Sequence, residues 1–149
     1  MLITQKHKYA LRAVFELARD GSDTPVKLSD IAHAQAIPTR FLEVIMAKLR
    51  QQGLVESKRG FTGGYRLVRR PSQITVGDIF RLIEEPENQE RCNACATQDE
   101  CPLNGTCAFL PLWDQLQNAI FQVYDQTTIE DLLRGGGNCG AAWAPGPCG

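Results

Sequence analysis

Apolar residues recur every three or four positions through the first part of the chain, which is the spacing of amphipathic α-helices. The first stretch of this kind predicts a helix over residues 4–20, with Thr4 as its cap. A short second helix is predicted from Ser29 to about Gln35. Near the start of the first helix lie Lys6, Lys8 and Arg12, which either touch a phosphate backbone or simply face solvent.

A third helix is predicted over residues 39–52, with Pro38 just before it and Gly53 as its stop signal. Its expected apolar stripe is Phe41, Leu42, Ile45, Met46 and Leu49. Its opposite face is Thr39, Arg40, Glu43, Ala47 and Arg50. A short helix, a tight turn and a second helix with a polar face have the layout of a DNA-binding helix-turn-helix.

Two short extended segments follow, at residues 54–58 and 65–69, and a glycine-rich turn joins them. This pattern predicts a β-hairpin, which directly after a helix-turn-helix is a wing. Lys58 and Arg59 lie at its tip, where flexible glycines would let a cation reach a narrow DNA groove. Turn geometry alone would also explain the glycines.

The second half of the chain begins with Thr75 and Asp78, a capping pair that predicts a helix to about Glu85. A long helix is predicted from about Leu110, and a new capping sequence at residues 127–130 predicts a short terminal helix. The apolar stripe of the long helix follows a three-four-three spacing and consists of Trp113, Leu116, Ile120 and Val123.

An amphipathic helix outside the winged domain needs a partner for its apolar stripe. The same helix of a second copy is the expected partner, because a two-fold dimer matches a palindromic DNA site. The alternative is that the helix folds back on its own domain. The expected fold class is mostly α with a small β-hairpin wing, a winged helix-turn-helix plus a long dimerisation helix.

This reading divides the chain into four parts. They are a winged helix-turn-helix DNA-binding domain at residues 1–85, a cysteine-rich loop at 86–108, the long and terminal helices at 109–134, and a flexible tail rich in glycine, proline and cysteine at 135–149. The tail contains Cys139 and Cys148, for which exposed thiols of a disordered segment are the favoured interpretation and a thiol pair or additional metal ligands are the alternatives.

Charge is distributed unevenly between the two halves. Residues 1–85 carry 14 Lys and Arg against 9 Asp and Glu, whereas residues 86–149 carry 2 against 8. A basic first half and an acidic second half indicate that only the first meets a polyanion. No secretion signal and no apolar run long enough for a membrane span is apparent, so we expect a cytoplasmic protein with reduced thiols and no membrane partner.

Four cysteines fall within sixteen residues, at Cys92, Cys95, Cys101 and Cys107. Thiolates this close, in a reducing compartment, indicate a metal site more than disulfides. Structural zinc prefers two short C-x2-C pairs, and only one is present here. The spacing itself therefore leaves zinc and an iron–sulfur cluster both open. No catalytic constellation is apparent, since His7 and His33 lack a nucleophile partner, and an enzyme is not expected.

Three segments together resemble the bacterial regulator family of IscR and NsrR: residues 36–55, residues 59–67 and residues 74–79. This resemblance, which extends over residues 1 to about 133, implies a homodimeric winged-helix transcription factor with an iron–sulfur cluster beside the long helix. The segment from Cys95 through Cys101 to Cys107 is similar to the three cysteine ligands of the iron–sulfur assembly regulator.

The fourth ligand departs from the family. That regulator has a histidine three residues after its third cysteine, where this chain has Leu110, and nitric-oxide-sensing relatives use a carboxylate where this chain has Lys8. Cys92 is the obvious substitute, and Cys92 and Cys95 could exchange roles. For the cofactor, 2Fe–2S is favoured over 4Fe–4S.

The resemblance also implies DNA contacts by Thr39, Arg40, Glu43 and the wing residue Arg59. Arg50, Lys58 and Thr62 complete the predicted interface. A glutamate can accept a hydrogen bond from a cytosine amino group but repels phosphate, so Glu43 is expected to discriminate between sites. The predicted function is a repressor whose affinity for a double-stranded operator depends on the cluster. The alternatives are a zinc- or thiol-based regulator and a cluster carrier.

Overall fold

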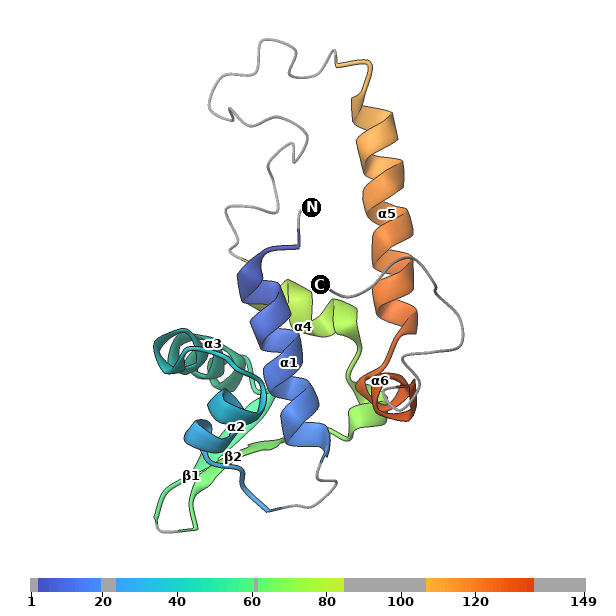
Figure 1. The fold of residues 1–149 in the computed structure, drawn as a ribbon. Helices are drawn as coiled ribbons and strands as arrows, with labels where there is room; N and C mark the ends of the chain where they lie inside the picture. Colours follow the sequence, from blue (N-terminus) through green and yellow to red (C-terminus); the bar gives the residue numbers. More distant parts are fainter. Residues whose placement is uncertain (1–2, 20–23, 61, 85–106, 136–149) are drawn as a thin grey trace, which may run out of the picture.

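The computed structural model describes residues 3–19, 24–60, 62–84 and 107–135. These residues form helices joined by a small antiparallel hairpin, as Figure 1 shows, and this confirms the expected fold class. The elements in chain order are α1 (Gln5–Arg19), α2 (Leu28–Ala34), α3 (Thr39–Gln51), β1 (Val55–Lys58), β2 (Gly64–Leu67), the 3-10 turn η1 (Pro71–Gln73), α4 (Val76–Ile83), α5 (Leu110–Gln126) and α6 (Ile129–Gly135).

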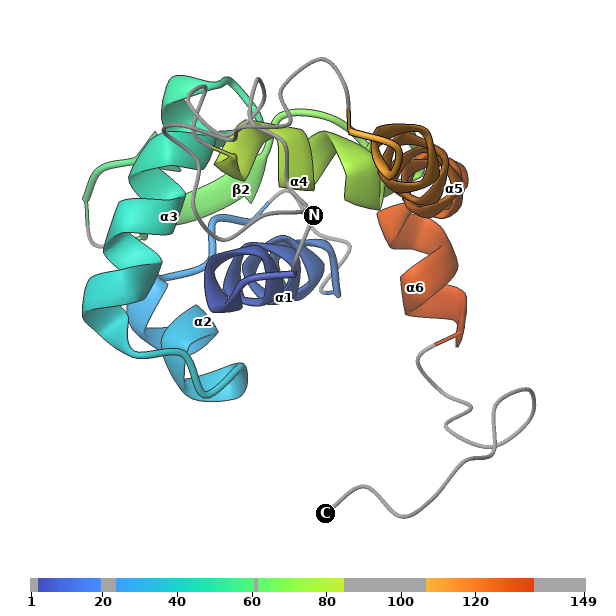
Figure 2. The same cartoon turned by 90° about the horizontal axis from the view of Figure 1, so that it is seen from above.

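Helix α1 is the centre of the fold. It contacts α2, α3, α4, α6 and β2, and Figure 2 shows these elements arranged around it. Its buried face contains the small residues Ala10 and Ala13 beside Val14, all of them without exposed surface. Small side chains let neighbouring helices approach closely, so α1 serves as the common support of the helix-turn-helix and of the C-terminal helices.

The expected cap of α1 is confirmed. The His7 backbone N–H donates to Thr4 Oγ1 at 3.4 Å, and the Thr4 backbone N–H donates to His7 Nδ1 at 3.3 Å. His7 thus takes the place that Glu or Gln has in a capping box. The predicted start of the second helix is wrong by one residue: α2 begins at Leu28 rather than at Ser29.

The apolar stripe expected for the third helix is correct except at its first member. Leu42, Ile45, Met46 and Leu49 are buried, but Phe41 is 62% exposed. Phe41 lies at the edge of the buried face, where its ring meets Tyr9 of α1 at a centroid distance of 6.3 Å. The core ends at this point of α3, and the outer part of the helix is free for another contact.

Helix α4 begins with the expected capping box, in which the Asp78 N–H donates to Thr75 Oγ1 at 3.0 Å and the Thr75 N–H donates to Asp78 Oδ2 at 3.2 Å. The terminal helix α6 joins the same core. Ile129 is completely buried, and its backbone N–H donates to the Ile74 carbonyl at 2.9 Å. The division made from sequence grouped this helix with the long helix, whereas it packs on α1 and η1.

No helix in the described part of the chain is long and apolar enough to cross a membrane.

Candidate nucleic-acid interface

Helices α2 and α3 form a compact unit around a tight turn. The Ile37 N–H donates to the Ala32 carbonyl at 2.9 Å, which closes the turn behind α2. Ala36 within the turn has a φ of 47°, a left-handed conformation that non-glycine residues rarely adopt. Pro38 then leads into α3, whose first turn closes by the Leu42 N–H on the Pro38 carbonyl at 3.1 Å. This is the geometry of a helix-turn-helix.

Helix α1 anchors this turn through a polar network. The Arg12 guanidinium donates to both the backbone carbonyl and the side-chain oxygen of Gln35, and the Gln35 amide donates to Glu16 Oε2 at 2.6 Å. Glu16 is buried at 7% exposure, and Arg19 forms an ion pair with it at 2.7 Å. The half-buried Arg12 therefore holds the turn, a role that the sequence did not predict.

The second helix of the unit presents its predicted polar face to solvent. All of the side chains expected there are exposed, namely Thr39, Arg40, Glu43, Ala47 and Arg50. Arg50 Nη1 also donates to Ser57 Oγ of the wing at 3.2 Å. A side-chain hydrogen bond at the surface thus joins the exposed face of α3 to the wing.

The wing is an antiparallel hairpin in which Val55 pairs with Leu67 and Lys58 pairs with Gly64. Two positions of the hairpin require glycine, each for a different physical reason. Gly60 has a φ of +111°, and a Cβ at Gly64 would lie 2.4 Å from the Val26 carbonyl oxygen. Val26 and Tyr65 exchange two backbone hydrogen bonds of 2.8 Å. The glycine at position 64 therefore lets the segment before α2 pair with the base of the wing.

Several cations on this side have no ion-pair partner among the described residues. They include Arg40 on α3 and Lys58 and Arg59 at the wing, all of them exposed, while Thr62 lies exposed beyond the tip. Sequence reasoning missed Arg69 and Arg70, which are exposed where the chain leaves the wing. Their signal was simply an adjacent pair of arginines after a strand. Unpaired cations around a projecting helix are suited to phosphate contacts.

Helix α5 projects from the core as an arm, as Figure 1 shows. None of its residues is buried, and its N-terminal half exposes a large apolar surface. Trp113 is 40% exposed, Leu116 is 50% exposed and Val123 is 61% exposed, while Ile120 is half-buried. Leu112 and Phe109 extend this surface. The stripe predicted from the spacing is thus present, and within the described chain most of it is uncovered.

Among the described residues, the C-terminal end of α5 contacts the core chiefly at α4. The Arg81 guanidinium donates two hydrogen bonds of 2.7 Å to the Asp125 carboxylate, which lowers the pKa of Asp125. Arg81 also lies 4.7 Å from the centroid of the Phe121 ring, and Phe80 meets Tyr124 edge to face at 4.9 Å. The C-terminal end of α5 is therefore held on its own domain, whereas its N-terminal part has no such contact among the described residues.

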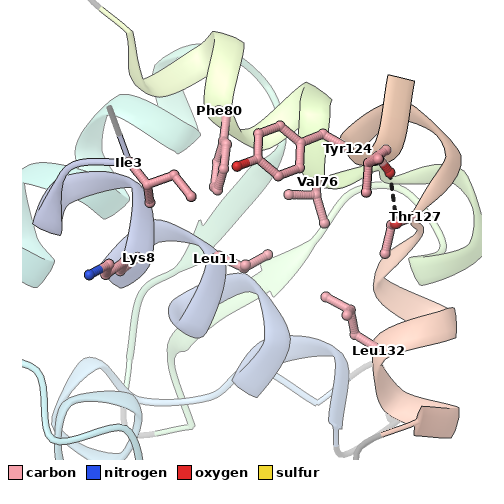
Figure 3. Close-up of a pocket in the computed structure, with 9 residues that line it drawn as sticks. Ile3, Lys8, Leu11, Val76, Phe80, Tyr124, Thr127 and Leu132 are labelled. Atoms are coloured by element: carbon pink, nitrogen blue, oxygen red, sulfur yellow. Dashed lines mark hydrogen bonds between the residues drawn. The ribbon is translucent and has the colours of Figure 1, made fainter. Parts of the chain in front are cut away.

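An apolar cavity of about 360 Å³ lies at this junction (Figure 3). Its walls come from all four neighbouring helices, and its lining includes Leu11, Val76, Phe80, Tyr124 and Leu132. Lys8, the charged residue among the described residues of the lining, directs its amino group away from the rings in Figure 3.

Helix α3, the second helix of the helix-turn-helix, is linked to α4 by a side chain. Lys48 of α3 donates from Nζ to the Ile83 carbonyl at 2.9 Å and to the Glu84 carbonyl at 3.2 Å. These are the terminal carbonyls of α4, where a cation is favourable because of the helix dipole. The recognition helix is therefore attached to the residues that immediately precede the cysteine-rich segment.

The cysteine prediction falls mostly outside the described residues. Cys92, Cys95, Cys101, Cys139 and Cys148 all lie in ranges that the structure does not describe, as do the loop and tail assigned to them. Cys107 is described: it is a free, half-buried thiol, and its carbonyl accepts a hydrogen bond from the Leu110 N–H at the start of α5. Among the described residues no group of three metal-ligating side chains occurs.

A helix-turn-helix held on a central helix, followed by a basic wing and an apolar helical arm, defines a winged-helix DNA-binding regulator. The chain belongs to the Rrf2 family, whose model, described as an iron-dependent transcriptional regulator, matches residues 3–135.

Individual relatives agree with this assignment. Protein rrf2 of Nitratidesulfovibrio vulgaris is 32% identical over 142 residues, covering 93% of this chain and 91% of that protein. The structure of T. potens IscR superposes with a TM-score of 0.72 at 31% identity, covering 97% of this chain and 94% of that one. The structure of CymR, titled the global cysteine regulator of B. subtilis, gives a TM-score of 0.70 at 35% identity, covering 90% and 97%.

Proposed function

We propose that this transcriptional regulator is a cytoplasmic homodimer that binds a palindromic operator as a repressor, and that an iron–sulfur cluster sets its operator affinity. The observation that carries the DNA-binding part is the exposed outer face of α3 beside a wing with unpaired cations. In this arrangement α3 enters the major groove, and the wing follows the backbone or the adjacent minor groove.

Each predicted side chain has a definite role in this proposal. Thr39 and Arg40 lie in the first turn of α3, the part of a recognition helix that contacts base edges. Glu43 discriminates by accepting from a cytosine amino group. Arg50, Lys58, Arg59 and Thr62 contact the backbone or the minor groove, which positions the helix and contributes most of the affinity.

The dimer forms through the free stripe of α5, in which Trp113, Leu116, Ile120 and Val123 take part. Burying large apolar side chains of this kind contributes roughly 1.5 to 3 kcal/mol each. A second copy supplies an identical stripe, and an isologous contact puts the two recognition helices on one side of a two-fold axis. That arrangement suits an operator with two related half-sites.

The proposed cluster ligands are Cys107 together with Cys101 and either or both of Cys92 and Cys95. Thiolates are the donors that an iron–sulfur cluster requires, and Cys107 supplies one directly before α5. The cluster, with 2Fe–2S favoured, supplies sensitivity to iron, redox state or nitric oxide. The similarity to IscR proteins and the iron-dependent description of the family support this assignment.

The protein's own contacts give the cluster segment a route to DNA. The segment begins next to Glu84, whose carbonyl Lys48 of the recognition helix contacts, and it ends at α5. Arg81 and Asp125 join the same α4 to the base of α5. A change in the segment would therefore alter the position of α3 relative to the dimer arm, and a two-fold operator tolerates little error in that spacing.

The decisive experiment compares two forms of one preparation. The protein is purified anaerobically, its absorbance, iron and sulfide are measured, and an operator obtained by binding-site selection is titrated with the loaded protein and with the metal-free protein at fixed salt. We expect brown protein with charge-transfer absorption and different affinities for the two forms. Equal affinities would exclude the sensing role even if the cluster is present.

A regulator without a cluster is the second candidate. The similarity to CymR, whose title names it a cysteine regulator, supports this alternative. In it, the thiols bind zinc or react with oxidants, or a metabolite or partner protein gives the signal. Zinc protein is colourless, so the same spectrum and metal analysis separate the two. A cluster carrier, the third alternative, would show no salt-dependent DNA affinity.

A further inference from the structure

The outer face of α3 carries an apolar residue that its predicted polar face did not include. Val44 is 61% exposed, although it lies in the middle of the helix. One turn before it is Arg40 and one turn after it is Ala47, and both are exposed as well. These three residues form a row that faces directly away from the core, and Val44 is its one large apolar member.

Phe41 is equally exposed but belongs to a different row. One turn farther along from Phe41 is Ile45, which is buried, and two turns farther along is Lys48, which donates to the carbonyls of α4. Its ring meets Tyr9 of α1. Phe41 therefore closes the edge of the core, and the row through Val44 is the part of α3 left for a partner.

A single exposed apolar side chain is common on protein surfaces and indicates nothing by itself. Here the position and the neighbours are informative. A β-branched valine is a weaker helix former than arginine, lysine, glutamine or glutamate, so solvent exposure alone does not favour it at this site. It lies beside Arg40 and Glu43, which carry the hydrogen-bonding groups of the proposed interface.

We propose that Val44 recognises the C5 methyl group of a thymine in the major groove of the operator. Thymine is the only standard base that presents a methyl group there, and apolar side chains recognise it by contact rather than by hydrogen bonding. Arg40 and Glu43 read donor and acceptor groups of neighbouring base pairs, and Val44 adds a position at which thymine is preferred to cytosine. This inference rests on the proposed function, because it requires α3 to lie in the major groove.

The test uses the full-length protein and the operator obtained by binding-site selection. Each thymine in a half-site is replaced in turn by uracil, which removes the methyl group and leaves every hydrogen-bonding group in place. We expect one replacement to weaken wild-type binding about fourfold, the effect of leaving one methyl group unburied. In the Val44→Ala variant, replacement at that position should have no effect, and replacements elsewhere should act as in the wild type.

Two further variants control the experiment. Val68→Ala truncates another valine, 54% exposed and outside α3, and should retain the full uracil penalty. Val44→Ile retains a large apolar side chain and should retain a preference for thymine. If Val44→Ala binds the operator with unchanged consensus and unchanged uracil penalties, the methyl contact is refuted and the DNA-binding function stands. If no specific operator is selected at all, both proposals fail together.

Discussion

At the scale of single residues, the turn of the helix-turn-helix contains a residue in an unfavourable conformation. Ala36 has a φ of 47°, where its Cβ is crowded by the backbone. The turn keeps this conformation because Arg12 and the buried Glu16 hold Gln35 directly before it. Local strain is thus balanced by a network that reaches from another helix.

Replacing Ala36 by glycine should stabilise the protein. Glycine removes the steric cost of the left-handed conformation but adds freedom to the unfolded chain, so we expect a net gain of about 0.5 to 1 kcal/mol in the free energy of unfolding. Urea denaturation measures it. Ala34→Gly is the matched control, because Ala34 ends α2 in helical conformation and its replacement should destabilise. Equal effects of the two variants would show that position 36 is unstrained.

The buried side chain of His7 makes the stability of the fold depend on pH. It is 5% exposed, it lies 5.0 Å from Phe80 between ring centroids, and its Nε2 has no hydrogen-bond partner among the described residues. Burial lowers the pKa of His7 below its ordinary value of 6.5, and the nearby charges of Lys6 and Lys48 lower it further. Below pH 6.5 the unfolded chain therefore binds more protons than the folded chain.

The sign of the pH dependence follows directly. Because the unfolded state gains the proton more readily, the free energy of unfolding should fall as pH decreases from 7 through 6.5 toward the lowered pKa of the folded state. His7→Gln should remove this part of the dependence, since glutamine retains a capping box with Thr4 and does not titrate. His33→Gln, at the exposed histidine, is the control and should leave the wild-type profile in place.

Arg59, at the tip of the wing, is expected to contribute to DNA affinity whatever the sequence of the site. As an exposed cation at the wing without an ion-pair partner in the described chain, it is free to neutralise a phosphate or enter a minor groove. Arg59→Ala should weaken binding to all sequences similarly and reduce the slope of log K against log salt by about 1. Arg134→Ala, on α6, is the control. An unchanged slope would remove the wing tip from the mechanism.

At the scale of elements, the two ends of α5 have different surroundings among the described residues. The C-terminal end is fixed to α4 by Arg81 and Asp125, and Gly77 makes this contact possible, because a Cβ there would lie 1.9 Å from Asp125 Oδ1. The N-terminal end extends beyond the core with its apolar side chains exposed. A helix that is fixed at its C-terminal end and exposes apolar side chains beyond it is suited to bind a second copy in a defined orientation.

Charging the stripe of α5 should separate the dimer. In a Trp113→Glu and Ile120→Glu double variant, two carboxylates would have to be buried without partners, which costs far more than the apolar contact contributes. Analytical ultracentrifugation should then show a monomer. The control places the same charges on the opposite side of the helix, as Gln115→Glu and Gln122→Glu, and should remain dimeric. A dimeric stripe variant would mean that α5 packs elsewhere.

At the scale of the whole molecule, the cysteine-rich segment lies in sequence between two helices that are already in contact. It follows α4 and precedes α5, and α4 also carries the carbonyls to which the recognition helix is attached through Lys48. A cluster held by that segment would act at the point where the DNA-reading unit and the dimer arm meet. No long-range path through the core is needed for the signal.

Individual cysteine substitutions test this arrangement. Cys101→Ala and Cys107→Ala should each abolish the cluster and alter operator affinity, whereas single replacement of Cys92 or Cys95 should have a milder effect, because each can replace the other. Cys139→Ala and Cys148→Ala are the controls in the tail and should retain full iron. Absorbance and iron content are measured first, and operator titration at fixed salt follows. Full iron in Cys101→Ala would refute the ligand assignment.

The sequence by itself determined the elements of this protein. The helices, their caps at Thr4 and Thr75, the hairpin and the stripe of α5 were all predictable, because they depend on residues within a few positions of one another. Helical periodicity separates a buried face from an exposed one, and the break at Pro38 separates two helices. The order of these elements was sufficient to predict a winged helix-turn-helix.

Only the tertiary structure decided which side chains remain available for a partner. Arg12 binds Gln35, 23 positions away, and Lys48 binds Ile83, 35 positions away, so two apparent surface cations have internal partners. Phe41 lies at the edge of the core, and Val44 lies on the exposed face of α3. Ile129 is buried in the core of the winged domain and so packs the terminal helix against it. These outcomes depend on contacts between segments far apart in the chain, and local periodicity contains no information about them.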